Sequence, residues 1–177
     1  MKYEVHVKGI APLLFNRFPD EENPDGKSKR SAGNPSKEEQ VERSLYLNKD
    51  KKVFQPAAHF VGAMVKAAVN FKLQGKKTYK DVVQGGIFVE PEEIIHENQK
   101  YTTDWRSVVI KSTRGRIMKG RARMEDWQLK FTISCIDPRA TDKDIKEILE
   151  YAGMYVGIGD YRPRYGRFEV VSFKRID

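Results

Sequence analysis

Three arginines, the two tyrosines beside them and several glycines gather in the segment Gly153–Val170, which reads GMYVGIGDYRPRYGRFEV. The glycines permit a tight turn and a close approach of the backbone to a ligand, and the side chains supply charge and flat stacking surfaces. The charged and aromatic residues are Arg162, Arg164, Arg167, Tyr161 and Tyr165. Because amides and guanidinium groups both suit phosphate, the segment predicts nucleic-acid binding. A glycine-rich hairpin turn with solvated arginines is the alternative.

A second basic segment, Lys111–Trp127, reads KSTRGRIMKGRARMEDW. Its basic residues stand around two glycines and are Arg114, Arg116, Lys119, Arg121 and Arg123. We interpret residues 105–131 as a basic hairpin that lies along a sugar-phosphate backbone. An exposed, well-solvated hairpin is the other interpretation, but the coincidence with the glycine-rich segment favours binding.

Positive charge is segregated along the chain. The formal net charge is +8, and residues 105–131 alone contain eight Lys or Arg against two Asp or Glu. Residues 161–175 contain five against one, whereas residues 20–50 contain eight acids against six bases. A merely solubilising surface would not need this segregation, so the pattern favours a polyanion, single-stranded RNA or single-stranded DNA.

The sequence shows no enzyme signature. His6, His59 and His96 are widely separated and Cys135 is the only cysteine, so no zinc-ligand spacing is present. The glycine-rich segment lacks the Gly-Lys-Ser/Thr ending of a Walker loop, and the carboxylates show no catalytic pairing. We therefore predict no catalytic residue, no metal and no cofactor.

Nothing in the sequence indicates a membrane partner or secretion. The first ten residues, MKYEVHVKGI, alternate polar and apolar side chains, whereas a signal peptide carries a continuous apolar stretch. No later segment approaches the length that spans a bilayer. A single cysteine suits a reducing compartment, so we expect a cytoplasmic protein.

The two basic segments need elements that position them. Period-two alternation predicts strands, and apolar spacing of three and four predicts helices. The predicted strands are 2–9, 87–89, 108–118, 128–136 and 167–173, and the predicted helices are 57–72 and a second that Thr141 caps and Gly153 ends. The order strand, helix, strand, strand, helix, strand predicts a ferredoxin-like α+β fold with an antiparallel sheet, two helices and inserted loops or hairpins.

A single domain over residues 1–177 accounts for the length of the chain. Residues 45–54 predict a hairpin. Residues 20–43 are rich in Pro, Gly, Ser, Asn and charge and show no apolar periodicity, so we predict a mobile insertion loop there.

Three segments resemble a known family. Residues 51–68, KKVFQPAAHFVGAMVKAA, resemble the strand, proline and helix that open the core of the RAMP proteins of CRISPR systems, although Ala57, Ala58 and His59 stand where a run of serines is usual. Residues 157–170, GIGDYRPRYGRFEV, resemble the C-terminal glycine-rich loop of that family, and VKGIAPLLF resembles its first strand. The resemblance implies a modified ferredoxin or RNA-recognition domain, similar to the backbone subunit that polymerises along guide RNA.

The resemblance also implies which side chains face RNA. They are His59 and Lys66 on the polar side of the first helix and Arg162, Arg164 and Arg167 in the loop. The leading hypothesis is a guide-RNA-binding subunit of a CRISPR-like or phage-encoded ribonucleoprotein, whose partners are RNA and copies of itself or other RAMP-like subunits. Two alternatives remain open. One is a metal-independent endoribonuclease that uses histidine, and the other is a phage structural or regulatory protein that binds an acidic protein.

Overall fold

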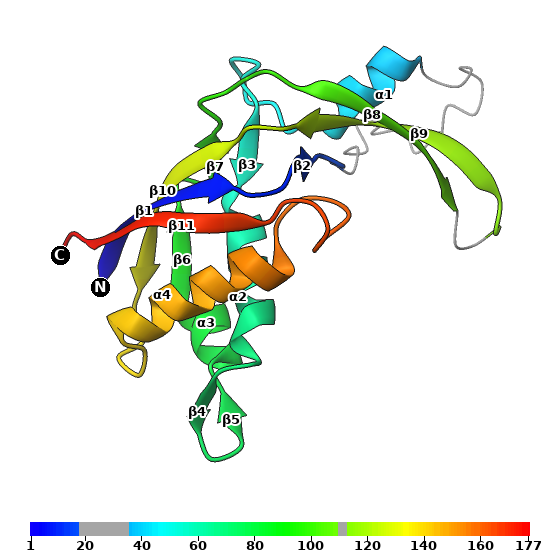
Figure 1. Ribbon diagram of the computed structural model, residues 1–177. Coiled ribbons are helices and arrows are strands. Elements are labelled where there is room, and N and C mark those ends of the chain that lie inside the picture. The colour runs from blue at the N-terminus through cyan, green and yellow to red at the C-terminus, as the bar shows by residue number, and fades with distance from the viewer. Residues whose placement is uncertain (18–35, 110–112) are drawn as a thin grey trace, which may run out of the picture.

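A four-stranded antiparallel sheet forms the centre of the structure, a computed structural model that describes residues 1–17, 36–109 and 113–177 (Figure 1). Its strands are β1 (Lys2–Gly9), β6 (Ile87–Glu90), β10 (Gln128–Cys135) and β11 (Phe168–Arg175). They lie in the order β11-β1-β10-β6. Because side chains alternate along a strand, Tyr3, Val5 and Val7 are buried on one face of β1 and His6 lies on the other.

Two main helices cover the buried face of this sheet, α2 (Ala57–Ala68) and α4 (Asp142–Tyr151) (Figure 1). The Phe60 ring of α2 lies 4.4 Å from that of Phe131 on β10 and 5.5 Å from that of Phe168 on β11. The chain order β1-α2-β6-β10-α4-β11, with β10 between β1 and β6, is the split βαβ arrangement. The predicted ferredoxin-like α+β fold is therefore confirmed.

Helix α4 begins as predicted and ends later. Thr141 accepts a hydrogen bond from the Asp144 amide, and the Asp144 carboxylate accepts one from the Thr141 amide. Gly153 does not end the helix, because a π-helical turn, η1 (Ala152–Val156), continues it as far as Gly157, where φ is 73°. Gly153 instead allows close packing, since a Cβ there would meet the Phe168 backbone.

Helix α2 has the predicted apolar stripe but is shorter than predicted. Phe60, Met64 and Ala67 are fully buried. The helix ends at Ala68, not at residue 72, because a small hairpin follows. Its strands β4 (Lys72–Gln74) and β5 (Lys77–Thr78) turn at Gly75, where φ is 58°, and lead into α3 (Lys80–Gly86).

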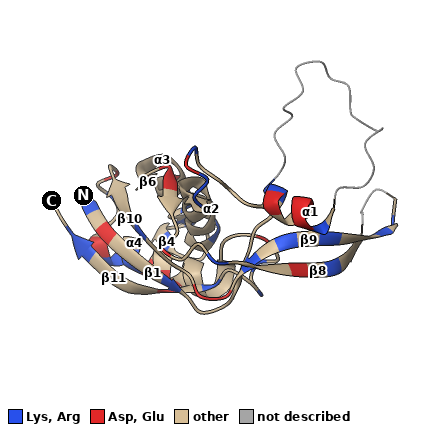
Figure 2. Cartoon of the chain, turned by 90° about the horizontal axis from the view of Figure 1, so that it is seen from above, with Lys and Arg blue, Asp and Glu red and all other residues tan. Residues whose placement is uncertain are grey.

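A second sheet extends away from the first. Its strands are β8 (Thr102–Val109), β9 (Arg116–Met124) and the short β2 (Leu13–Leu14). The hairpin of β8 and β9 projects from the body, and Lys and Arg recur along β9 (Figures 1 and 2). The prediction of one strand over 108–118 is wrong, because the turn between β8 and β9 falls inside that range. The basic range 105–131 spans most of this hairpin and then enters β10 of the central sheet.

Residues 20–35 of the predicted loop lie outside the described residues. Residues 37–43 correct that prediction, because they belong to helix α1 (Lys37–Ser44). Ser36 and Glu39 form a capping box, and Ser44 Oγ accepts a hydrogen bond from the Ala122 amide of β9 at 2.8 Å. A helix of eight residues buries few side chains, so the sequence of α1 shows little apolar periodicity.

Two further strands pair with each other outside the two larger sheets. Strand β3 (Phe54–Pro56) pairs with β7 (Glu93–Ile95), and the predicted hairpin of residues 45–54 is present, with a bridge between Leu47 and Val53. None of the described helices is long and apolar enough to cross a membrane.

Candidate nucleic-acid interface

The glycine-rich loop is fixed to the start of the chain. The Asp160 amide donates to the Leu14 carbonyl at 2.9 Å, and the Gly166 amide donates to the Pro12 carbonyl at 2.8 Å. Gly159 has a φ of 77°, and a Cβ there would lie 2.6 Å from the Leu14 carbonyl oxygen. The glycines therefore allow close contact with the chain's own backbone, and they hold residues 161–165 at a fixed place.

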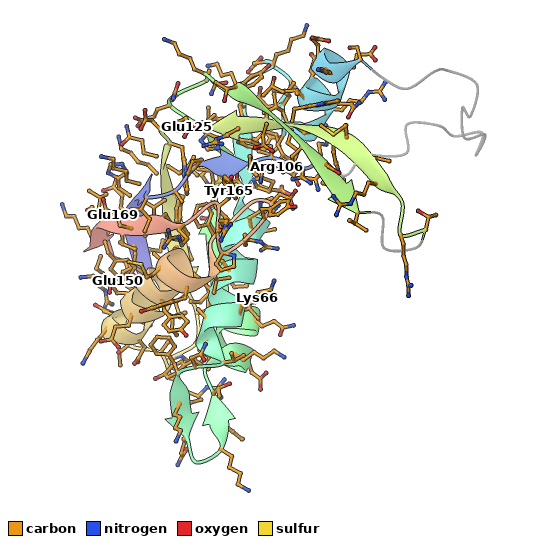
Figure 3. All side chains as sticks on the ribbon, turned by 45° about the vertical axis from the view of Figure 1, so that its right-hand side comes forward. Lys66, Arg106, Glu125, Glu150, Tyr165 and Glu169 are labelled. Atoms are coloured by element: carbon orange, nitrogen blue, oxygen red, sulfur yellow. The ribbon has the colours of Figure 1, made fainter. Side chains whose placement is uncertain are left out.

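Two tyrosines of this loop pack against arginines of the hairpin. The Arg106 guanidinium lies 5.3 Å from the ring centres of both Tyr161 and Tyr165, and it donates to the Tyr165 hydroxyl at 2.9 Å. Arg121 lies 5.0 Å from the Tyr161 ring, and Arg123 lies 5.7 Å from the Tyr165 ring. Figure 3 shows Arg106 and Tyr165 side by side. The two basic segments found in the sequence thus meet in space.

Two carboxylates neutralise part of this cluster. Asp104, which is 6% exposed, accepts two hydrogen bonds from Arg106, and Asp160 Oδ2 lies 3.0 Å from Arg121 Nε. Hydrogen bonds to Asp104 and Tyr165 raise the pKa of Arg106. A buried charge needs a close partner, so the Arg121–Asp160 pair holds the hairpin and the loop together, whereas the Asp104–Arg106 pair lies within the hairpin.

The five basic residues predicted in this hairpin divide between two places. Lys119, Arg121 and Arg123 alternate on the side that faces the loop, because residues two apart share a face of a strand. Burial and then the neighbouring Arg121 lower the pKa of Lys119. Arg114 and Arg116 are exposed at the far end of the hairpin, and the structure does not bring them to the loop.

The two helical residues that were expected to face RNA lie on one side of α2. His59 and Lys66 stand seven positions apart, which is roughly 10 Å along the helix axis. Lys66 is exposed. His59 is half-buried and hydrogen-bonded to the Gln55 amide, and burial and then Arg162 lower its pKa. A neutral imidazole at neutral pH does not supply charge for phosphate.

A pocket of about 220 Å³ opens between the loop, the start of α2 and the chain after β2. This volume is well above the roughly 15 Å³ that one water needs. Its polar lining residues are Asn16, Tyr46, Gln55, His59, Asp160 and Arg162. Asp160 belongs both to the pocket and to the ion pair with Arg121, so the pocket adjoins the arginine and tyrosine cluster.

The loop arginines differ in exposure. Arg162 and Arg164 are exposed, and among the described residues neither forms an ion pair. Arg167 is half-buried, and its Nε is buried without a hydrogen-bond partner among those residues. The Arg167 carbonyl also accepts hydrogen bonds from Ile10 at 2.9 Å and Ala11 at 3.3 Å, so this arginine is part of the fold.

The histidines are not brought together. His6 lies on the open face of the sheet and hydrogen-bonds to Gln128 at 3.1 Å, whereas His59 is on a helix over the opposite face. His96 is 1% exposed and packs edge-on against Phe15. Within the ranges that the structure describes, no cluster of His, Cys, Asp and Glu could hold a metal ion.

Sequence reasoning missed several residues of this region. Asp104 and Arg106 stand two apart on a strand, and that spacing was the available signal for their shared face. Gln55, Tyr46 and Asp160 carry no sequence signal, because only the fold brings them together. The β4–β5 hairpin was also overlooked, although the exposed Lys72, Lys76, Lys77 and Lys80 stand within nine residues.

The chain was compared with solved structures, and one match shares its fold. A chain of the cryo-EM structure of the type III-B Cmr-beta bound to cognate target RNA matches with a TM-score of 0.62 and 10% identity, over 98% of this chain and 59% of that chain. A CRISPR protein from Archaeoglobus fulgidus matches with a TM-score of 0.42 and 16% identity, over 99% and 64%. The present chain therefore spans less than two thirds of either one. No protein-family model matches the sequence, and neither does any curated protein. At the level of the fold alone, the resemblance drawn from the sequence is confirmed by the first match.

Proposed function

We propose that this chain binds single-stranded RNA, as the guide-RNA-binding subunit of a CRISPR-like or phage-encoded ribonucleoprotein. The observation that carries the proposal is the packing of Tyr161 and Tyr165 onto Arg106, Arg121 and Arg123. This packing joins the loop and the hairpin into one basic surface with aromatic rings, a combination typical of single-strand binding.

The fold supports this proposal. The chain from the Cmr-beta complex, which has the same fold, was solved with target RNA bound. That chain is longer and belongs to a complex of several subunits, so we extend the proposal to assembly with copies of this chain or with other RAMP-like subunits.

The charges that remain free indicate where phosphate would bind. Arg106, Arg121 and Arg123 already pair with carboxylates. The cations without an ion pair among the described residues include Lys66, Lys119, Arg162 and Arg164, which stand around the loop and along α2. We assign phosphate contacts to these four and positioning to the paired arginines.

The double variant Arg162→Ala/Arg164→Ala tests the proposal. We expect it to weaken RNA binding by more than tenfold, because a hydrogen bond to a charged group contributes roughly 1.5 to 3 kcal/mol. The slope of log affinity against log salt should also fall by about 1.4, since each phosphate contact on a single strand accounts for about 0.7. Fluorescence anisotropy with labelled RNA and DNA oligonucleotides over a salt series measures both quantities and separates the two nucleic acids.

The matched control is Lys143→Ala/Lys146→Ala on α4. It removes the same charge from a helix where each lysine is 3.7 Å from a glutamate one turn on. We expect affinity and salt slope to stay close to those of the unaltered protein. Equal weakening by both double variants would mean that net charge alone governs binding and that the loop is not the interface.

A further inference from the structure

The pocket beside the loop contains a buried amide that is only partly satisfied. Gln55 is 1% exposed, and its Nε2 meets His59 Nδ1. Its Oε1 is buried and has no hydrogen-bond partner among the described residues, although it belongs to a residue that lines the pocket. Buried acceptors in folded proteins are nearly always paired, so this oxygen indicates a donor that arrives with a ligand.

A second acceptor belongs to the same lining. Asp160 lines the pocket, and its Oδ2 lies 3.0 Å from Arg121 Nε in an ion pair. The rings of Tyr46 and His59 are 5.3 Å apart at a nearly perpendicular angle and form aromatic walls, and Arg162 stands at the rim. The pocket therefore combines flat ring surfaces with one acceptor that lacks a donor, Gln55 Oε1, and one carboxylate that is paired with an arginine.

These features decide between classes of ligand. A phosphate group is disfavoured, because it would bring negative charge against the Asp160 carboxylate and the Gln55 carbonyl. A planar group that carries N–H donors fits both the acceptors and the rings. Among the bases of RNA, an exocyclic amino group supplies two N–H donors, whereas uracil has one N3–H between two carbonyls that would face the acceptors.

We infer that the pocket takes up one unstacked base of the bound strand and prefers adenine, cytosine or guanine to uracil. The inference rests on the proposed RNA binding and adds a base preference to it, whereas phosphate contacts alone would read no sequence. Single-stranded RNA presents bases that can leave the stack, and amide side chains commonly read their edges.

Cytosine and uracil oligonucleotides of equal length provide the test, because cytosine carries an amino group where uracil has a carbonyl, and the single N3–H of uracil lies between two carbonyls. We expect the cytosine oligomer to bind roughly tenfold tighter, in line with the discrimination that paired base-edge hydrogen bonds give. Gln55→Met removes the acceptor and keeps the length of the side chain, so it should bring the cytosine-to-uracil affinity ratio close to one. Lys76→Ala, on the β4–β5 hairpin outside the pocket, should leave that ratio unchanged.

A second comparison needs no protein variant. Adenine oligomers are compared with oligomers of unsubstituted purine, which lack the amino group, on the unaltered protein, and the purine oligomer should bind more weakly. If Gln55→Met does not fold in a thermal unfolding scan, this comparison decides the question. Equal binding of both members of each pair overturns the inference and leaves RNA binding standing. No binding of any oligomer overturns the proposed function as well.

Discussion

Arg121 and Arg162 are both near Asp160, yet the two guanidinium groups have different surroundings. Arg121 is 4% exposed and forms an ion pair with Asp160, whereas Arg162 is exposed and has no ion pair among the described residues. Composition counts them as equal positive charges. Burial separates them, because a buried guanidinium must stay with its partner and an exposed one can bind a ligand.

Single substitutions should separate these two tasks. Arg121→Ala leaves Asp160 without its cation, so we expect it to lower the free energy of unfolding by about 2 kcal/mol. Arg162→Ala should change that free energy by no more than about 0.5 kcal/mol and should weaken RNA binding instead. Urea unfolding and anisotropy measure the two effects. Equal loss of stability in both variants would contradict this division.

The burial of His96 predicts how the free energy of unfolding depends on pH. Burial lowers its pKa from 6.5 to about 4, so between those values the unfolded chain binds more protons than the folded one. The contribution of the neutral His96 to the free energy of unfolding should be fully present above pH 6.5. It should be lost as the pH drops toward 4, by about 3 kcal/mol in total.

His96→Phe is the matched variant, because it keeps a ring against Phe15 and removes the titrating group. The loss of stability between pH 6.5 and 4, followed by urea unfolding, should become much smaller in this variant. A loss of the same size in both proteins would assign the pH dependence to other groups.

The elements that the sequence predicted best are long and two-sided. β1, β10, α2 and α4 each bury one face, and their alternation or stripe was visible in the chain. The predictions failed where a neighbour decides the structure. α1 is helical because it packs on β9, and α2 stops early because the β4–β5 hairpin begins.

The cap of α1 should control the exchange of amides in β9. Ser36→Ala removes the capping hydrogen bond, which costs about 1 kcal/mol. Because Gln40 and Ser44 accept hydrogen bonds from the Gly120 and Ala122 amides, we expect faster hydrogen exchange at those two amides by NMR.

Thr141→Ala provides the control, because it removes an equivalent cap from α4, which lies on the central sheet. It should leave exchange at Gly120 and Ala122 unchanged. If Ser36→Ala also leaves it unchanged, α1 does not brace the hairpin.

At the scale of the whole molecule, the sequence showed where the charged segments are, but it did not show that they contact each other. The loop and the hairpin were each visible from composition, and the fold brings them into contact. The pocket could not be predicted, because its lining comes from four separated parts of the chain, around residues 14–16, 46, 55–59 and 159–162. Only the closure of the tertiary structure places an amide, a carboxylate and two rings around one space.

Strand β2 has a mechanical consequence. It is two residues long, its Leu13 and Leu14 pair with the Met124 end of β9, and the Leu14 carbonyl also accepts a hydrogen bond from the loop. β9 extends from there for nine residues, roughly 30 Å. The hairpin is thus held at β2, and Leu14 of that strand also forms part of the pocket wall. We therefore expect a force at the far end of the hairpin to act over a long lever arm on β2 and on the pocket side chains beside it.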